Sequence, residues 1–251
     1  MAGVAIRQGW KRGAERATTR RMSLAPPLDR PAWSALATGW AHLARGDARA
    51  LQLEPAFGPF AAAADRAPAN MAALAEFEPG ADGLWLVETE ETEAPPPGLA
   101  IKLQAVVSQM VAEAITPGAA EFEVTALTEA DAAEMRALAH LTRPGPFAER
   151  THQLGEFIGV KLDGRLVAMA GERMRPEGFA EVSGVCTLPE HRGQGYAAGL
   201  MRIVARRILE RGEIPFLHAY AANTGAIRLY ETLGFRLRRP VVLTILTKAA
   251  A

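Results

Sequence analysis

The sequence is poor in the residues that mark several protein classes. Its 251 residues include a single cysteine, Cys186, so an intrachain disulfide and a cysteine-based metal cluster are both excluded. No apolar run approaches the length of a membrane span, and the formal net charge is zero. No segment has the basic surplus that is typical of a nucleic-acid-binding domain. Together these absences predict a cytoplasmic globular protein with neither a membrane nor a nucleic acid as its partner.

Charge is unevenly spread along the chain. Residues 1–22 carry six basic side chains and one acidic one, whereas residues 23–120 carry five basic and twelve acidic ones. The first segment lacks the long apolar core of a secretion signal, although its arginine-rich, acid-poor composition is shared with transit peptides. We favour a disordered basic tail over residues 1–25, or untranslated sequence that precedes a start at Met22.

Two proline-bearing stretches divide the rest of the chain. Pro26-Pro27 ends the basic tail, and Thr116-Pro117-Gly118 is typical of a linker. We therefore expect a smaller α/β domain over residues 26–118 and a second domain over residues 119–251. Because the first domain carries no chemical motif, we expect it to have a structural role or to contribute to the substrate side.

Within the first domain the local patterns predict one long helix and a late strand. Apolar residues at helical spacing predict a helix over residues 30–45. Residues 99–107 read as a strand, and residues 108–114 as a short helix or turn. In the second domain, Asp163-Gly164 predicts a two-residue β-hairpin turn.

Neither common phosphate-binding fingerprint occurs. The sequence has no Gly-x-x-x-x-Gly-Lys-Ser/Thr, and no third glycine at dinucleotide-fold spacing. Residues 182–201 instead read as a strand, a turn that contains Gly193 and Gly195, and a helix. A helix that begins directly after such a turn directs free N–H groups and the positive end of its dipole at one point. The stretch therefore predicts an anion site that suits a pyrophosphate.

Two motifs together carry a family resemblance. The stretch from Arg192 to Ala197, RGQGYA, fits Arg/Gln-x-x-Gly-x-Gly/Ala and resembles the coenzyme A pyrophosphate loop of the GNAT superfamily of N-acetyltransferases. Further on, Asn223 at a helix start, Tyr230 within the helix and Gly234-Phe235 before a strand resemble the second signature of that superfamily. The match covers about residues 121–247, and its general character resembles the glycine N-acyltransferase-like branch.

The resemblance implies a fold and a reaction. It implies a GNAT acyltransferase fold with a mixed α/β sheet in the C-terminal half, preceded by a smaller α/β domain that could be a degenerate copy of the same fold. It implies transfer of an acetyl or short acyl group from acetyl-CoA to an amine, by direct attack in a ternary complex. A non-catalytic acyl-CoA sensor or interaction module remains the alternative. We expect a monomer or a homodimer.

The resemblance also implies which residues bind the acyl donor. The backbone of the strand would pair with the pantetheine arm, and a bulge at Gly184 would part this strand from the next one. The expected cofactor-binding residues are Val185, Cys186, Thr187, Arg192, Gly193, Gln194, Gly195, Tyr196, Ala197, Ala198, Asn223 and Tyr230.

Acyl transfer from a thioester to an amine is catalysed by a general acid and a general base. By this resemblance, Tyr230 corresponds to the tyrosine that protonates the leaving thiolate in the family. Glu181 corresponds to a glutamate that acts as the general base in some members. His218 is a weaker alternative base, and Cys186 is expected to be a buried apolar residue rather than a nucleophile. Arg143 or Arg150 could bind a carboxylate of the acceptor.

No metal is expected, because the histidines lack the spacing of metal ligands. Those considered are His140, His152, His191 and His218.

Overall fold

The structure is a computed structural model that describes residues 26–250. The predicted tail over residues 1–25 and the start at Met22 lie outside the described residues. In chain order the helices and strands are α1 (Pro26–Asp29), α2 (Pro31–Ala37), β1 (Ala44–Gly46), β2 (Ala50–Leu53), β3 (Ala61–Ala63), α3 (Pro68–Ala75), β4 (Leu84–Glu88), β5 (Leu99–Val111), β6 (Thr125–Leu127), α4 (Ala132–Thr142), β7 (Phe157–Leu162), β8 (Arg165–Glu172), β9 (Phe179–Thr187), α5 (Tyr196–Glu210), β10 (Ile214–Tyr220), α6 (Thr224–Thr232) and β11 (Arg236–Lys248). Short 3-10 helices lie at Ala41–Leu43, Glu129–Asp131, Thr151–Gln153 and Pro189–His191.

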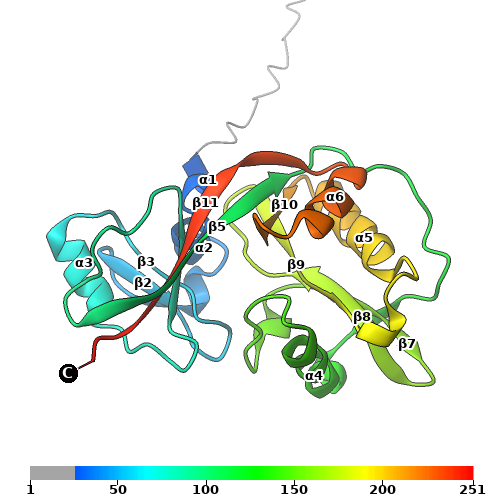
Figure 1. The fold of residues 1–251 in the computed structure, drawn as a ribbon, viewed down its shortest axis with the longest axis horizontal. Helices are drawn as coiled ribbons and strands as arrows, with labels where there is room; N and C mark the ends of the chain where they lie inside the picture. Colours follow the sequence, from blue (N-terminus) through cyan, green and yellow to red (C-terminus); the bar gives the residue numbers. More distant parts are fainter. Residues whose placement is uncertain (1–25, 251) are drawn as a thin grey trace, which may run out of the picture.

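One large mixed sheet connects most of these elements. Its eight strands follow the order β4-β11-β5-β10-β9-β8-β7-β6, and a separate antiparallel sheet has the order β1-β2-β3 (Figure 1). All neighbours in the large sheet are antiparallel except β9 and β10, which are parallel. The predicted mixed α/β class is therefore confirmed. Among residues 26–250, no helix combines the length and the apolar character needed to cross a membrane.

The N-terminal part packs onto the large sheet through its own small sheet and helices. Helix α2 contacts β2, β3 and β4, and α3 contacts β2 and β3. Trp40, which follows α2, is 2% exposed and donates its indole N–H to the carbonyl oxygen of Arg173 at 3.1 Å. The expected helix over residues 30–45 is wrong in length, because α2 ends at Ala37. A Cβ on Gly39 would lie 2.3 Å from the carbonyl oxygen of Arg175, so this close approach to the C-terminal half requires a glycine.

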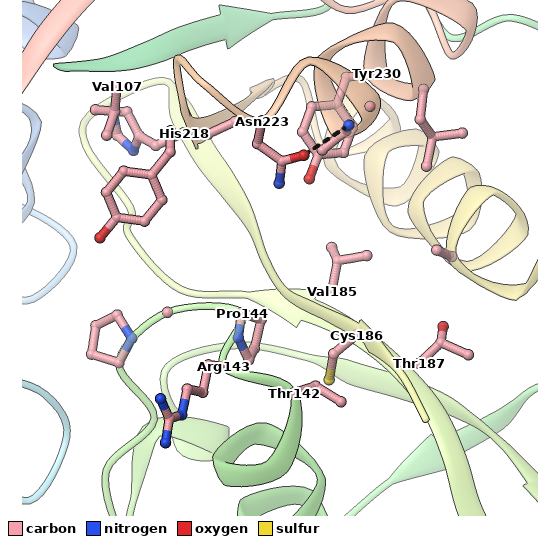
Figure 2. A pocket seen from close by; sticks show the side chains of 18 of the residues that line it. Val107, Thr142, Arg143, Pro144, Val185, Cys186, Thr187, His218, Asn223 and Tyr230 are labelled. Atoms are coloured by element: carbon pink, nitrogen blue, oxygen red, sulfur yellow. Dashed lines mark hydrogen bonds between the residues drawn. The ribbon is translucent and has the colours of Figure 1, made fainter. Parts of the chain in front are cut away.

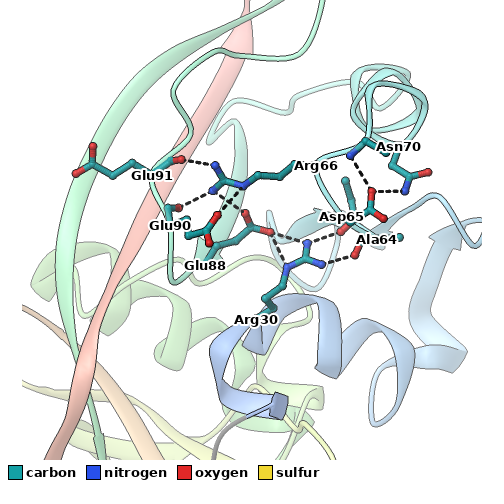
Figure 3. A network of polar contacts seen from close by, with 10 residues as sticks. Arg30, Ala64, Asp65, Arg66, Asn70, Glu88, Glu90 and Glu91 are labelled. Atoms are coloured by element: carbon teal, nitrogen blue, oxygen red, sulfur yellow. Dashed lines mark hydrogen bonds and ion pairs between the residues drawn. The ribbon is translucent and has the colours of Figure 1, made fainter.

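A polar network fastens α2 to this part of the chain (Figure 3). Arg30 donates to the carboxylate of Glu88 at 2.6 and 3.1 Å and to the carbonyl oxygens of Ala63 and Ala64. Arg66 donates to the carbonyl oxygens of Glu90 and Glu91 and lies 3.6 Å from the Glu88 carboxylate. The two guanidinium groups thus share one half-buried carboxylate, and the contacts join the loops after β3 and β4.

The long strands β5 and β11 run through both parts of the molecule (Figure 1). Strand β5 pairs with β11 along almost its whole length and with β10 on its other edge. The expected helix or turn over residues 108–114 is therefore wrong up to Val111, because that stretch is hydrogen-bonded as a strand on both edges. Residues 26–118 and 119–251 consequently share one sheet, so their division into two domains stays a prediction.

The C-terminal part begins with antiparallel hairpins that α4 and α5 cover. Both helices pack against β8 and β9, and the apolar face of α5 is formed by Leu200, Met201, Val204, Ala205 and Ile208, all at most 2% exposed. The predicted hairpin turn at Asp163-Gly164 is present, with φ of +50° and +78° at its two residues. The candidate site lies on this part of the sheet.

Candidate active site

Strands β9 and β10 separate after the first three residues of each strand. They are paired only between residues 179–181 and 214–216. Beyond Glu181, β9 is bonded to β8 alone, and β10 to β5 alone, within the part of the chain that the structure describes. Gly184 has φ of +63°, and the β8–β9 register shifts beside it, so the expected bulge is present. An opening between the two strands follows from this geometry.

A cavity of about 590 Å³ occupies this opening (Figure 2). Its walls come from β9, β10, α6 and the segment after α4, with further residues from β4, β5 and β11. The lining residues are Trp85, Val107, Thr142, Arg143, Pro144, Gly145, Pro146, Arg173, Val185, Cys186, Thr187, Arg192, Ala197, His218, Ala219, Tyr220, Asn223, Gly225, Ala226, Leu229, Tyr230 and Leu243. The set contains three arginines and no carboxylate.

The structure brings seven of the twelve expected cofactor-binding residues to this cavity. They are Val185, Cys186, Thr187, Arg192, Ala197, Asn223 and Tyr230. The other five, Gly193, Gln194, Gly195, Tyr196 and Ala198, do not line it. They form the turn and the first residues of α5 at its edge.

The turn before α5 is open. Gly193 and Gly195 have φ of +81° and +79°, a conformation that favours glycine, and a Cβ on either would meet no atom within 4 Å. Gly195 is the N-cap of α5, so the first amides of the helix have no intrahelical acceptor. Tyr196 packs edge-on against Phe122 with ring centroids 4.9 Å apart, which anchors the helix start.

Tyr230 reaches the cavity from α6, the helix that Asn223 caps. The Asn223 side chain accepts a hydrogen bond from the backbone N–H of Ala226 at 3.2 Å, as the dashed line in Figure 2 shows. Burial raises the pKa of the Tyr230 phenol above its usual value. The phenol therefore keeps its proton at neutral pH, as a proton donor must.

Cys186 lines the cavity as a thiol rather than a thiolate. It is 7% exposed, and burial raises its pKa to about 11 despite a hydrogen bond with the side chain of Thr142. A nucleophilic role requires the thiolate. The placement agrees with the expected passive role.

Glu181 lies behind the cavity wall instead of in it. Its side chain is 1% exposed and accepts hydrogen bonds from Arg173 Nε at 2.9 Å and Nη2 at 3.1 Å. His218 Nδ1 lies 2.9 Å from Glu181 Oε1. Burial alone would raise the pKa of Glu181, but the Arg173 charge and the His218 hydrogen bond lower it to about 2. Glu181 is thus an ionised carboxylate with no direct path to the cavity, whereas His218 and Arg173 both line it.

Comparison with known proteins identifies the family. The family model described as FR47-like protein matches residues 158–242. A crystal structure assigned to the acetyltransferases of the GNAT family, from Novosphingobium aromaticivorans, is 49% identical, with a TM-score of 0.82. The match covers 90% of this chain and 100% of that one. This chain belongs to the GNAT family of N-acetyltransferases.

A second solved structure supports the fold of this GNAT protein. The GCN5-related N-acetyltransferase from Kribbella flavida is 21% identical with a TM-score of 0.61, and the match covers 89% of this chain and 96% of that one. Both comparisons extend well beyond the C-terminal half, so the N-terminal part belongs to the shared architecture. None of the curated proteins matches the chain.

The GNAT cavity offers the groups that an acyl-CoA requires. The edge of β9 over residues 182–187 faces the opening without a partner strand in the described chain, so it can pair with an extended arm. Thr187 Oγ1 is buried and lacks a hydrogen-bond partner among the described residues. At the other end lie the open glycine turn, the free amides of α5 and the exposed Arg192. The donor set therefore fits an acyl-CoA.

Several residues that line the cavity belong to no sequence motif. Trp85 and Val107 come from the N-terminal half, where no motif signals them. Tyr220 lies at the end of β10 and is 48% exposed. The only sequence signal for its place in the cavity is an aromatic residue at the end of an expected strand. Of the two arginines expected at the acceptor side, Arg143 lines the cavity, while Arg150 stacks over the Phe57 ring at 4.4 Å instead.

Arg143 takes a strained backbone conformation at the rim. It ends α4 with φ of +53° and donates its backbone N–H to the carbonyl oxygen of Ala139 at 2.7 Å. Its side chain is exposed and has no partner among the described residues. Elsewhere in residues 26–250, no group of three or more His, Cys, Asp and Glu side chains is arranged to hold a metal ion.

Proposed function

We propose that the cavity transfers an acetyl or short acyl group from acyl-CoA to an amine bound in the same cavity. The observation that carries the proposal is the parting of β9 and β10 beside a cavity that Tyr230 lines. An extended arm can lie along the free edge of β9 with its reactive end below the phenol. The two reactants then react with each other directly. A covalent enzyme intermediate on Cys186 is disfavoured because this thiol is protonated.

Different residues around the cavity bind different parts of the acyl-CoA. The amides at the start of α5, with Arg192 beside them, hold the diphosphate, since a helix N-terminus binds anions. The backbone of Val185 to Thr187 orients the thioester, and the partnerless hydroxyl of Thr187 donates to a polar group of the arm. Positioning of this kind removes much of the entropic barrier to a two-substrate reaction.

Proton transfer to the leaving group involves Tyr230. Tyr230, whose pKa is raised by burial, protonates the thiolate as the acyl group leaves. The amine attacks in its neutral form and gives up its proton to solvent, because both ring nitrogens of His218 face buried partners, Glu181 at 2.9 Å and Gln109 at 3.1 Å. Glu181 holds the His218 ring in place from behind the cavity wall.

The acceptor end of the cavity lies toward the N-terminal half. Trp85, Val107 and Tyr220 supply apolar and aromatic surface there, and Arg143 adds an uncompensated positive charge at the rim. A cavity with three arginines and no carboxylate disfavours a polycationic acceptor. A neutral or carboxylate-bearing amine suits it better.

The competing function is an acyl-CoA sensor that binds without turnover. A panel of amino acids, arylamines and polyamines, incubated with acetyl-CoA and monitored for free thiol, separates the two. Turnover of at least one acceptor, with a pH-dependent rate, supports the enzyme. Tight binding of acetyl-CoA without turnover of any acceptor in the panel would support the sensor and contradict the proposal.

Tyr230→Phe tests the acid in a competent acceptor reaction. The variant removes one hydroxyl and almost no volume, so CoA affinity should stay within about two-fold while the chemical step slows by roughly 10²- to 10⁴-fold. Tyr196→Phe is a matched control, because Tyr196 packs on Phe122 and does not line the cavity. An unchanged single-turnover rate in Tyr230→Phe would remove the phenol from the mechanism.

A further inference from the structure

The guanidinium group of Arg173 presents two different sides. Its Nε and Nη2 donate to the carboxylate of Glu181 at 2.9 and 3.1 Å, behind the cavity wall. Its Nη1 makes no hydrogen bond among the described residues, although the Arg173 side chain is only 11% exposed and lines the cavity. A Cβ on Gly145, another lining residue, would lie 3.5 Å from this Nη1. The two N–H groups of Nη1 are therefore hydrogen-bond donors at the cavity without an acceptor in the described chain.

The N-terminal half holds Arg173 in this position. The guanidinium carbon lies 5.0 Å from the centroid of the Phe60 ring, and the backbone carbonyl of Arg173 accepts the indole N–H of Trp40 at 3.1 Å. Phe60 packs edge-on against Trp85, which lines the cavity, with ring centroids 6.3 Å apart. Arg173 thus lies at the Trp85 end of the cavity, where the proposed function places the acceptor. Its free donors face the acceptor rather than the diphosphate of acyl-CoA.

A second guanidinium group belongs to the same rim. Arg143 is exposed, has no side-chain partner among the described residues, and stands two positions before Gly145, the residue closest to Arg173 Nη1 in this segment. Arg143 and Pro144 lie across the cavity from His218 (Figure 2). None of the described carboxylate side chains lines the cavity. Two guanidinium groups without a competing carboxylate suit a planar anion such as a carboxylate.

The wall next to the arginines is apolar. Trp85, Val107 and Leu243 line the cavity and pack in one hydrophobic cluster with Phe60, the ring over which Arg173 lies. Val107 and Leu243 are each only 5% exposed. The three lining residues come from β4, β5 and β11, which are neighbours in the sheet. An acceptor with an apolar group can bury that group on this wall while its charged end reaches the arginines.

We propose that Arg173 and Arg143 form a carboxylate-binding subsite, so that the acceptor is an amine that carries both a carboxylate and an apolar group. This assignment rests on the proposed function, because it takes the amine to react in this cavity. The carboxylate accepts from Nη1 of Arg173 and from the guanidinium of Arg143. The contact with Glu181 fixes the plane of the Arg173 guanidinium beforehand, so little side-chain freedom is lost when the acceptor binds.

Matched pairs of acceptors that differ in one charge test the subsite. L-Phenylalanine is compared with L-phenylalaninamide, and 4-aminobenzoate with 4-aminobenzamide, each with saturating acetyl-CoA. The ratio of kcat/KM is expressed per unprotonated amine, because an amide lowers the basicity of a neighbouring amine. The wild type should favour the carboxylate by about ten-fold or more in at least one pair, as expected for a hydrogen bond to a charged group. Equal or faster reaction of both amides would overturn the proposal, as would turnover of uncharged amines or polyamines but of neither carboxylate.

Two variants test the arginines. Arg173→Lys keeps a positive charge for Glu181 but removes the separate Nη1 donor, and Arg143→Gln removes the charge at the rim. Each should lower the carboxylate-to-amide ratio by roughly three- to ten-fold, chiefly through a higher KM for the carboxylate, while the KM for acetyl-CoA stays unchanged. If Arg173→Lys does not fold, Arg143→Gln still provides the test. A ratio that remains at its wild-type value in the folded variants would overturn the proposal.

The chain offers a matched control for each variant. Arg211→Lys makes the same change at an arginine that binds the buried Glu172 at 2.7 Å and does not line the cavity. Arg150→Gln removes the same charge from the segment after α4, but Arg150 lies over the Phe57 ring outside the cavity. Both controls should keep the carboxylate-to-amide ratio of the wild type. A loss of the ratio in either control would show that the effect is not specific to the subsite and would overturn the proposal.

A binding measurement separates the subsite from the proposed function. Calorimetry on the CoA-saturated protein compares N-acetyl-L-phenylalanine with its amide and needs no turnover. The wild type should bind the carboxylate about ten-fold more tightly, and Arg143→Gln should lose most of this preference. If the wild type turns over no acceptor, the proposed function fails and this measurement alone decides the subsite. A preference for the carboxylate then supports it, and the absence of any preference overturns it.

Discussion

Replacement of Glu181 by Gln should remove a pH-dependent part of the stability. The ordinary pKa of a glutamate is 4.5, and that of Glu181 in the folded protein is about 2. A difference of about 2.5 units corresponds to roughly 3 to 4 kcal/mol of unfolding free energy, at about 1.4 kcal/mol per unit. Because the folded-state pKa is the lower one, this contribution is complete above about pH 5 and is lost as the pH falls toward 2.

The measurement is urea denaturation of wild type and Glu181→Gln between pH 7 and pH 3. At pH 7 the variant should be less stable by about 3 kcal/mol or more, because Arg173 and His218 lose their charged partner. The difference between the two proteins should shrink as the pH is lowered. A difference that stays constant from pH 7 to pH 3 would refute the assignment of a strongly depressed pKa.

Glu172 supplies a matched control of opposite sign. It is 4% exposed and bound to Arg211 at 2.7 Å, yet burial outweighs that partner and raises its pKa. Relative to Glu172→Gln, the wild type should therefore lose stability as the pH rises through the titration of this carboxyl. Both glutamates lie on neighbouring strands and each binds an arginine, so the opposite slopes isolate the effect of the individual surroundings.

Three further changes test the cavity and the sheet. Gly195→Glu should abolish CoA binding in calorimetry while the protein remains folded, because it sets bulk and negative charge beside the α5 amides; unchanged binding would exclude that turn. Gly184→Val should lower the melting temperature, since a Cβ there would lie 2.8 Å from Phe157 and the φ of +63° disfavours a branched residue; an unaltered melting temperature would contradict the need for the bulge. Residues 119–251 alone should be less soluble than the full chain, because without β5 the facing edges of β10 and β11 are bare; a soluble, monomeric fragment would show that the parts are separable.

Local features of the site could be predicted from the sequence because they depend on neighbours along the chain. Only glycine readily takes the left-handed conformation found at Gly193 and Gly195, and Asn223 caps its own helix. The positions of Tyr230 and the start of α5 follow from the same short-range rules. The two family motifs are therefore visible without coordinates.

Pairings between distant segments could not be predicted in this way. The stretch after residue 107 looks helical in isolation, but bonds from β10 and β11 on both edges make it a strand. Trp85 and Val107 reach the cavity only because β4 and β5 join the C-terminal sheet. No local periodicity encodes which strand edge a segment meets.

The family, the glycine turn and the tyrosine at the cavity could be predicted from the sequence alone, since each depends on a short motif. The surroundings of Glu181 depend on tertiary packing. Glu181 and His218 are far apart in the chain, and burial beside Arg173 turns the glutamate into a fixed anion while the histidine lines the cavity. Burial and charge pairing are properties of the packed sheet, and they set proton affinities that no stretch of sequence contains.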